Sequence, residues 1–313
     1  MMGGTYMYYP YLRGKQYELI ALREMLKEGT LPKCVVPIIE PVKASSTLKI
    51  SLRIFNDESH DLAVIQNSKV VSYEPFIKNE EVESLKKRPF FIPAVIGEAD
   101  RDISILAKYA NTKSMIILPS AAHPALNGQS PLWNQAIKVI ASDNRAMHRQ
   151  VRSGDEVVLE DPFEKKLRNA DYADKEDHFF SNTHIFYKQD GYAGFSNYSI
   201  IGSEFNSNGF TPKAVVIHIV YFRANEELWI RHFVSKTQDD SVDVAGKFAE
   251  ALEALMEWYH SSGFDHDRND SQALKEFEQM YKDKHYEGLG VVKKLSIKHH
   301  LEIMGRYLIG KEK

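Results

Sequence analysis

The chain has 313 residues, of which 43% are hydrophobic and 27% charged, and its formal net charge at pH 7 is -3. This is a globular composition, long enough for one large α/β domain or two ordinary ones. The small negative charge argues against a protein that binds polyanions over its whole surface, but it allows a local basic patch. Cys34 is the only cysteine, which excludes a disulfide framework and thiolate-rich zinc sites and favours a reducing compartment.

Targeting signals are not evident in the sequence. No stretch reaches the roughly 18 apolar residues of a membrane span. The first residues also lack a basic region followed by a long apolar one. We therefore expect a protein without a membrane segment, located in the cytoplasm.

The first 43 residues predict a strand, a helix and a second strand. Residues 7–12 form a short aromatic run that ends at Arg13-Gly14-Lys15, where glycine permits a tight turn. Residues 16–27 carry leucines three and four positions apart, which is typical of an amphipathic helix. Gly29 ends this helix, and the nearly continuous apolar run 34–42 indicates a buried parallel strand.

The alternation of strands and helices continues along the chain. Further strands are expected at 61–67, 90–97, 114–119, 156–159, 195–201 and 214–222, and helices at 45–55, 79–87, 100–109, 132–140 and 143–151. Residues 228–234 are expected to pair with 214–222 as a hairpin. The polar segment 164–184 is assigned to helix and loop, and three helices are expected at 242–260, 271–284 and 291–308.

Eight strands separated by helices imply a parallel sheet with right-handed crossovers. The sequence therefore predicts a (β/α)8 TIM-like barrel over residues 1–235. Residues 236–313 would be C-terminal helices that pack on or close the barrel and form no independent domain. A doubly wound open parallel sheet is the alternative, which the lack of a Gly-x-Gly-x-x-Gly motif after an early strand disfavours.

In such a barrel, ligands bind at the C-terminal ends of the strands. The ligand-binding residues expected there are Arg13, Lys15, Lys43, Asn67, Asn197, Tyr198 and Arg223. Glu40, Glu160 and Asp161 are the expected catalytic carboxylates. Carboxylates beside basic groups suit a divalent cation such as Mg or Mn and a phosphoryl group, the needs of metal-assisted hydrolysis. Glu160-Asp161-Pro162 equally suits a helix start, with proline at the first helical position.

The last predicted helix carries a cluster of basic residues: Lys293, Lys294, Lys298, His299 and His300. Adjacent histidines point about 100° apart on a helix, so this pair cannot chelate a metal as an i, i+4 pair does. A basic helical surface that contacts a partner protein or a nucleic-acid backbone is the preferred interpretation.

Several blocks of the chain resemble the "Beta protein" family of phage and bacterial proteins, and more closely an uncharacterised bacterial branch of it. These blocks are Tyr9-Pro10-Tyr11-Leu12-Arg13-Gly14-Lys15-Gln16, Pro37-Ile38-Ile39-Glu40-Pro41, Gly194-Phe195-Ser196-Asn197-Tyr198 and Gly288 to Glu302. Asn197 stands where the family carries aspartate. The resemblance implies a barrel-like α/β fold and a place among phage-conflict or mobile-element genes, beside a second, nuclease-like family. It implies no catalytic residues.

Two functions follow from these observations. The first is a component of a bacterial anti-phage defence or mobile-element conflict system that acts with a partner protein encoded nearby, such as a nuclease. The second is a metal-dependent phosphoryl hydrolase that acts on a nucleotide or nucleic acid at the barrel mouth.

Overall fold

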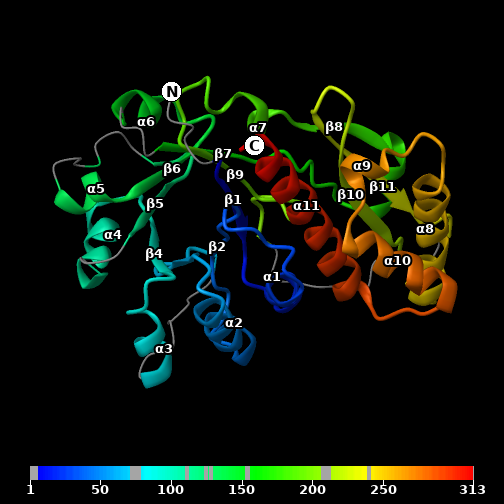
Figure 1. The fold of residues 1–313 in the computed structure, drawn as a ribbon, viewed down its shortest axis with the longest axis horizontal. Coiled ribbons are helices and arrows are strands. Elements are labelled where there is room, and N and C mark those ends of the chain that lie inside the picture. The colour runs from blue at the N-terminus through cyan, green and yellow to red at the C-terminus, as the bar shows by residue number, and fades with distance from the viewer. Residues whose placement is uncertain are drawn as a thin grey trace. The chain divides into compact units, whose positions relative to one another are not determined.

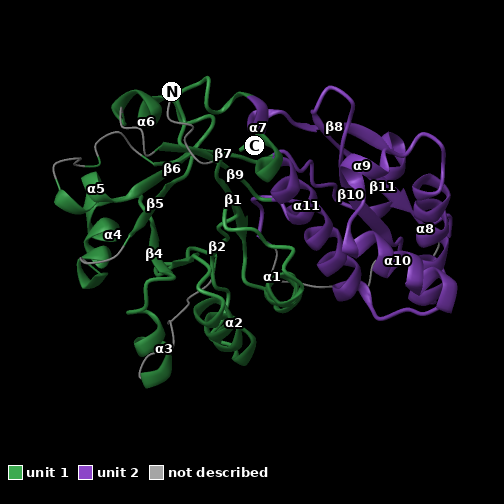
Figure 2. Ribbon diagram, viewed as in Figure 1, with its two compact units in different colours: residues 1–161, 186–198, 308–313 green, residues 162–185, 199–307 purple. Residues whose placement is uncertain are grey.

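The computed structural model describes residues 6–70, 79–109, 113–122, 126, 130–151, 156–205, 213–237 and 241–312. The chain divides into two compact units, which Figure 2 shows in different colours. The barrel unit comprises residues 1–161, 186–198 and 308–313, and the sheet unit comprises residues 162–185 and 199–307. The division therefore differs from the one predicted at residue 235, because residues 186–198 return to the barrel unit for one strand and residues 308–313 belong to it again.

The barrel unit is built on eight parallel strands that close on themselves (Figure 1). They are β1 (Tyr8–Leu12), β2 (Ile38–Ile39), β3 (Leu62–Ile65), β4 (Phe91–Ile96), β5 (Met115–Leu118), β6 (Ile137–Ala141), β7 (Glu156–Glu160) and β9 (Gly194–Asn197). The last of these, β9, pairs in parallel with both β1 and β7 and so completes the ring. The predicted (β/α)8 barrel is confirmed.

Helices alternate with the barrel strands along the chain. They are α1 (Gln16–Glu28), α2 (Ser46–Asp57), α3 (Glu80–Leu85), α4 (Asp100–Ser104), the 3-10 helix η1 (Ile105–Tyr109), α5 (Pro131–Gln135) and α6 (Arg145–Gln150). Side chains of Ser45, Asn79 and Asn144 cap the N-termini of α2, α3 and α6. Each cap satisfies a backbone N–H that the first helical turn leaves without a partner.

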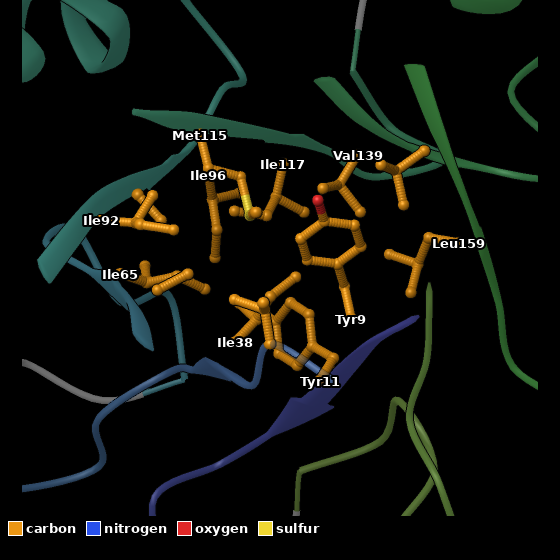
Figure 3. Packing of buried hydrophobic residues seen from close by; sticks show 14 residues of the cluster. Tyr9, Tyr11, Ile38, Ile65, Ile92, Ile96, Met115, Ile117, Val139 and Leu159 are labelled. Atoms are coloured by element: carbon orange, nitrogen blue, oxygen red, sulfur yellow. The ribbon is translucent and has the colours of Figure 1, made fainter. Parts of the chain in front are cut away.

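Alternate strand residues point into the barrel and fill it with apolar side chains (Figure 3). Tyr9, Ile92 and Met115 belong to this interior cluster. The intervening residues face outward, where Val95 and Ile116 pack against Trp133 and other side chains of the covering helices. Burial on both faces explains why these strands read as continuous apolar runs.

The sheet unit contains a three-stranded antiparallel sheet in the order β10-β11-β8. Its elements are the 3-10 helix η2 (Asn169–Lys175), β8 (Asp177–Ser181), β10 (Val216–Phe222), β11 (Leu228–Val234), α8 (Val244–Tyr259), α9 (His266–Asn269), α10 (Gln272–Asp283) and most of α11 (Leu289–Lys311). The short helix α7 (Thr183–Phe186) lies at the boundary of the two units.

The two faces of this sheet pack against different helices. On one face, Trp258 of α8 packs against Tyr221 of β10, with ring centroids 5.1 Å apart. On the other face, Tyr307 of α11 stacks on Phe222 of β10, with ring centroids 4.9 Å apart. The sheet is therefore a layer between α8 and α11.

Three strand predictions need correction. Residues 132–140, predicted as helix, contain the short α5 and then β6, which is a barrel strand. Residues 214–222 form a strand, but it is β10 of the antiparallel sheet and not the eighth barrel strand. Residues 177–181, placed in a helix and loop region, form β8. The predicted hairpin of 214–222 with 228–234 is confirmed by the antiparallel pairing of β10 and β11.

Among the helices that the structure describes, none combines the length and apolar composition needed to cross a bilayer.

Candidate functional site at the barrel mouth

The C-terminal ends of β1 and β2 place Arg13 and Glu40 next to each other. Leu12 and Ile39 are partners in the parallel ladder, so the residues that follow them lie side by side. Gly14 turns the chain at this point with a φ of +63°. A Cβ atom on Gly14 would lie 2.9 Å from Cγ2 of Ile39, so glycine permits the close approach as well as the turn.

The Glu18 carboxylate stabilises the turn between β1 and α1. Glu18 of α1 is fully buried, and its side chain accepts hydrogen bonds from the backbone N–H groups of Arg13 (2.8 Å) and Lys15 (3.3 Å). The turn after β1 is therefore fixed by the helix that follows it, which sets the direction of the Arg13 side chain.

The Glu40 carboxylate is engaged on both oxygens. It forms an ion pair with Arg13 and accepts a hydrogen bond from the Tyr11 hydroxyl at 2.8 Å. Its other oxygen accepts from the Ser68 hydroxyl at 3.1 Å and from the Lys69 backbone N–H at 2.9 Å. The residue is 1% exposed. Because so many donors surround it, this carboxylate suits the positioning of Arg13 better than the predicted catalytic role.

Two tyrosine rings lie next to the Arg13 guanidinium. Its central carbon lies 5.2 Å from the ring centroid of Tyr11 and 5.4 Å from that of Tyr198. Burial raises the pKa of Tyr198 to about 12, so its hydroxyl is protonated at neutral pH. The centroids of the two rings are only 4.7 Å apart. The result is a buried cation against a pair of touching aromatic rings, one of which is the neutral phenol of Tyr198.

Lys69 adds a second cation beyond the end of β3. Its ammonium lies 3.2 Å from Glu98 and 3.5 Å from Asp102. Neighbouring Asn67 has a structural role, because its side chain accepts from the N–H of Ile96 and donates to the same residue's carbonyl, each at 2.8 Å. The predicted ligand-binding amide of Asn67 thus joins the ends of β3 and β4.

Glu160 and Asn197 lie on the outer side of the barrel strands. Glu160 is the ladder partner of Asn197, and the Tyr8 hydroxyl donates to Asn197 Oδ1 at 2.7 Å. Gly194 faces the ring of Tyr9 inside the barrel. Side chains alternate along β9, so Asn197, three residues later, points outward. The predicted pair of carboxylates is therefore divided: Glu160 points away from the barrel axis, and exposed Asp161 follows at the strand end.

The other predicted ligand-binding residues are dispersed. Lys15 precedes α1, and Lys43 is exposed in the loop before α2. Arg223 follows β10 of the sheet unit and is therefore not at the end of a barrel strand. There its guanidinium lies 3.3 Å from the ring centroid of Trp229 and 3.1 Å from Asp177.

The prediction that the last helix exposes a basic surface is wrong for four of the five residues. Lys294, Lys298, His299 and His300 are buried, and only Lys293 is half-buried. The Lys298 ammonium lies 2.6 Å from Glu276 of α10. Lys298, His299 and His300 thus attach α11 to the rest of the sheet unit, and the four buried residues offer no open basic face.

The two histidines are neutral, hydrogen-bonded core residues. The Val220 carbonyl can only accept, so Nε2 of His299 donates to it at 2.7 Å, and Nδ1 accepts from the Ser271 hydroxyl at 2.8 Å. Burial lowers the pKa of His299 to about 4 and that of His300 to about 3.

Ser68 and Lys69 are the mouth residues that the sequence prediction missed. They could have been predicted from their position, because they follow the third strand one and two residues after Asn67. Within the described parts of the chain, no group of three or more histidine, cysteine, aspartate or glutamate side chains is arranged to hold a metal ion.

The fold and the mouth define a (β/α)8-barrel protein with a buried arginine at the C-terminal ends of its strands. No family model matches the sequence, and no curated protein matches it. A structural similarity exists to the thiamine phosphate pyrophosphorylase of Pyrococcus furiosus, with 12% sequence identity and a TM-score of 0.26 over 63% of this chain and 88% of that one.

Proposed function

We propose that the barrel mouth binds a small phosphorylated molecule through Arg13. The observation that carries this proposal is the buried guanidinium, which Glu40 and the rings of Tyr11 and Tyr198 hold at the C-terminal end of β1. Burying an ion pair costs desolvation energy that its mutual attraction often fails to recover. A fixed, partly desolvated guanidinium is, however, well suited to bidentate recognition of phosphate oxygens.

Two neighbouring groups support the same ligand class. Lys69 supplies a second positive charge, and its contact with Glu98, whose side chain is 47% exposed, is at the surface, where ion pairs are weak. The protonated Tyr198 hydroxyl supplies a neutral donor beside Arg13. Charge and hydrogen-bond donors thus converge where barrel proteins bind their ligands.

Calorimetric titration with inorganic phosphate and with nucleoside mono-, di- and triphosphates tests this proposal. Arg13→Lys keeps the charge and loses the planar fork, so we expect at least one phosphorylated compound to bind the wild type about tenfold more tightly than the variant. Lys113→Gln is the matched control, because Lys113 is exposed and pairs with Asp61 before β3, at the opposite end of the barrel. Equal affinities of wild type and Arg13→Lys would refute the proposal.

Metal-dependent phosphoryl hydrolysis is the alternative function at the same mouth. Asp161 favours it, as an exposed carboxylate after β7 whose charge acts on the pKa of Tyr198. Here Mg or Mn would bind the carboxylate and the phosphoryl oxygens together. Calorimetric titration of the wild type and Asp161→Asn with Mg and Mn tests this function. The wild type should bind one of the two ions and the variant should not.

The biological setting rests on the sequence resemblance. We propose that the protein acts in a bacterial anti-phage defence or mobile-element conflict system together with a partner protein encoded nearby. Co-expression with the neighbouring gene should yield a complex that withstands changes in salt, and a phage challenge should require both genes. A partner-free protein and unchanged phage sensitivity would contradict this setting.

A further inference from the structure

A cavity of about 270 Å³ opens within the sheet unit, and none of its lining residues belongs to the barrel unit. Its walls come from the segment after β7, from η2 and β10, and from the first two turns of α11. We call it the lysine cavity, because Lys165, Lys166 and Lys293 line it. Segments more than 100 positions apart thus bring three cations together around one small space.

Two of the three lysines, Lys165 and Lys166, pair with carboxylates that are exposed to water. Lys165 lies 3.7 Å from Glu204, whose side chain is 79% exposed, and Lys166 contacts Glu164, whose side chain is 53% exposed. Ion pairs so open to water are easily exchanged for another anion. Leu289 and Val292 of the first turn of α11 also line the cavity. The N-terminal end of this 23-residue helix adds a partial positive charge.

Another part of the wall of the lysine cavity is aromatic. Phe163 and Tyr172 line it with ring centroids 6.1 Å apart, and the ring of His218 lies 5.1 Å from the first and 4.7 Å from the second. The Tyr172 hydroxyl accepts a hydrogen bond from the Lys166 backbone N–H at 3.1 Å. The aromatic part of the wall is thereby attached directly to the segment that carries two of the lysines.

The histidine in this wall is uncharged. Burial, and then the neighbouring His232, lower the pKa of His218 well below its usual value. Its Nδ1 lies 2.7 Å from Nδ1 of His232, which faces it across β10 and β11, so one ring donates and the other accepts. His218 therefore presents a flat, neutral ring beside the lysines.

We propose that the lysine cavity binds a small molecule that carries a phosphate group on an aromatic ring. The three lysines and the start of α11 suit the phosphate, and the rings of Phe163, Tyr172 and His218 suit a flat apolar group. The volume is at the small end of ligand sites, which restricts the ligand to one ring or ring system and one phosphate.

Calorimetric titration of the full chain with phenyl phosphate, inorganic phosphate and phenol tests the proposal. Phenyl phosphate should bind at least tenfold more tightly than either fragment, because only it can contact both the lysines and the aromatic rings. Lys166→Gln and Lys293→Gln should each weaken its binding at least fivefold, and added salt should weaken binding to the wild type. Lys236→Gln is the matched control, since Lys236 lies in the same unit, is 78% exposed and does not line the cavity.

The same titrations separate this cavity from the barrel mouth. Binding of phenyl phosphate that Arg13→Lys abolishes and both lysine variants leave unchanged would assign the signal to the mouth and overturn the proposal. No saturable binding by the wild type at millimolar concentration would also overturn it. Loss of affinity in the two lysine variants but not in Arg13→Lys would establish a second ligand site, whatever the outcome at the mouth.

Discussion

Arg13 and Glu40 form a buried ion pair across the C-terminal ends of β1 and β2. The two residues are 27 positions apart in the chain, and the parallel pairing of Leu12 with Ile39 makes them neighbours. Glu40 also accepts hydrogen bonds from Tyr11, Ser68 and the Lys69 backbone, so three barrel strands end at one carboxylate. The pair is therefore both a structural centre of the mouth and the reason that Arg13 is fixed there.

Glu40→Gln should destabilise the protein strongly. The change leaves the Arg13 guanidinium buried without its counter-charge, and breaking a buried pair on one side costs about 3–5 kcal/mol. Urea unfolding followed by circular dichroism measures this loss. The double variant Arg13→Gln/Glu40→Gln should be less destabilised than the sum of the two single variants, and strict additivity would contradict a direct pairing.

Gly14→Ala should destabilise the protein more than Gly29→Ala. Both glycines have a positive φ, +63° and +71°, which costs a side-chain residue about 1–2 kcal/mol. A Cβ at Gly14 would also lie 2.9 Å from Ile39, whereas nothing lies within 4 Å at Gly29. The difference between the two melting temperatures isolates the steric clash at the mouth, and equal losses would show that the close approach is unimportant.

Ser271→Ala should cost more stability than Ser45→Ala. Each serine caps a helix by accepting a backbone N–H at 3.1 Å, from Leu274 and Leu48 respectively, a contact worth about 1 kcal/mol. Ser271 also donates to His299, so its removal leaves a buried ring nitrogen without that donor, at about 1–3 kcal/mol more. Chemical denaturation of both variants checks the order.

Stability should fall as the pH falls below 6.5. Burial lowers the pKa values of His300 and His232 to about 3 and that of His299 to about 4. Below 6.5 the unfolded chain therefore binds protons that the folded chain does not, and stability is lost progressively as the pH falls from 6.5 to about 4 for His299 and to about 3 for His232 and His300. Each such histidine contributes a slope of up to about 1.4 kcal/mol per pH unit.

His300→Asn provides the test of this pH dependence. Free energies of unfolding at pH 7, 6 and 5 should decline less steeply for the variant than for the wild type. His285→Asn is the control, because His285 is exposed and its loss should leave the slope unchanged. Parallel declines in wild type and His300→Asn would contradict a neutral, buried His300.

The barrel was predictable because its strands are short apolar runs separated by helices with clear periodicity. The same logic failed at residues 137–141, where five mostly apolar residues follow directly on the short α5. A fully buried strand and a buried helical segment have the same apolar pattern, so periodicity cannot separate them. The polar strand Asp177–Ser181 was missed for the opposite reason, since little of it alternates in the expected way.

The mouth was predictable only in part. Arg13 and Glu40 follow recognisable strands, and strand order in a barrel places such residues at one end. Arg223 was misplaced because β10 resembles any other strand in sequence, and alternation does not reveal which sheet a strand joins. The basic residues of α11 were misjudged because charge usually means exposure, whereas Lys298 pairs with Glu276 and His299 bonds to Ser271 inside the unit.

The sequence by itself determined the type of fold, since hydrophobic periodicity follows local backbone geometry and alternating strands and helices favour a parallel barrel. It also determined that polar side chains would follow β1 and β2. Only the tertiary structure decided that Glu40 fixes Arg13, that Glu160 faces outward, and that Lys165, Lys166 and Lys293 share one cavity. These relationships depend on register and on contacts between distant segments, which no local pattern encodes.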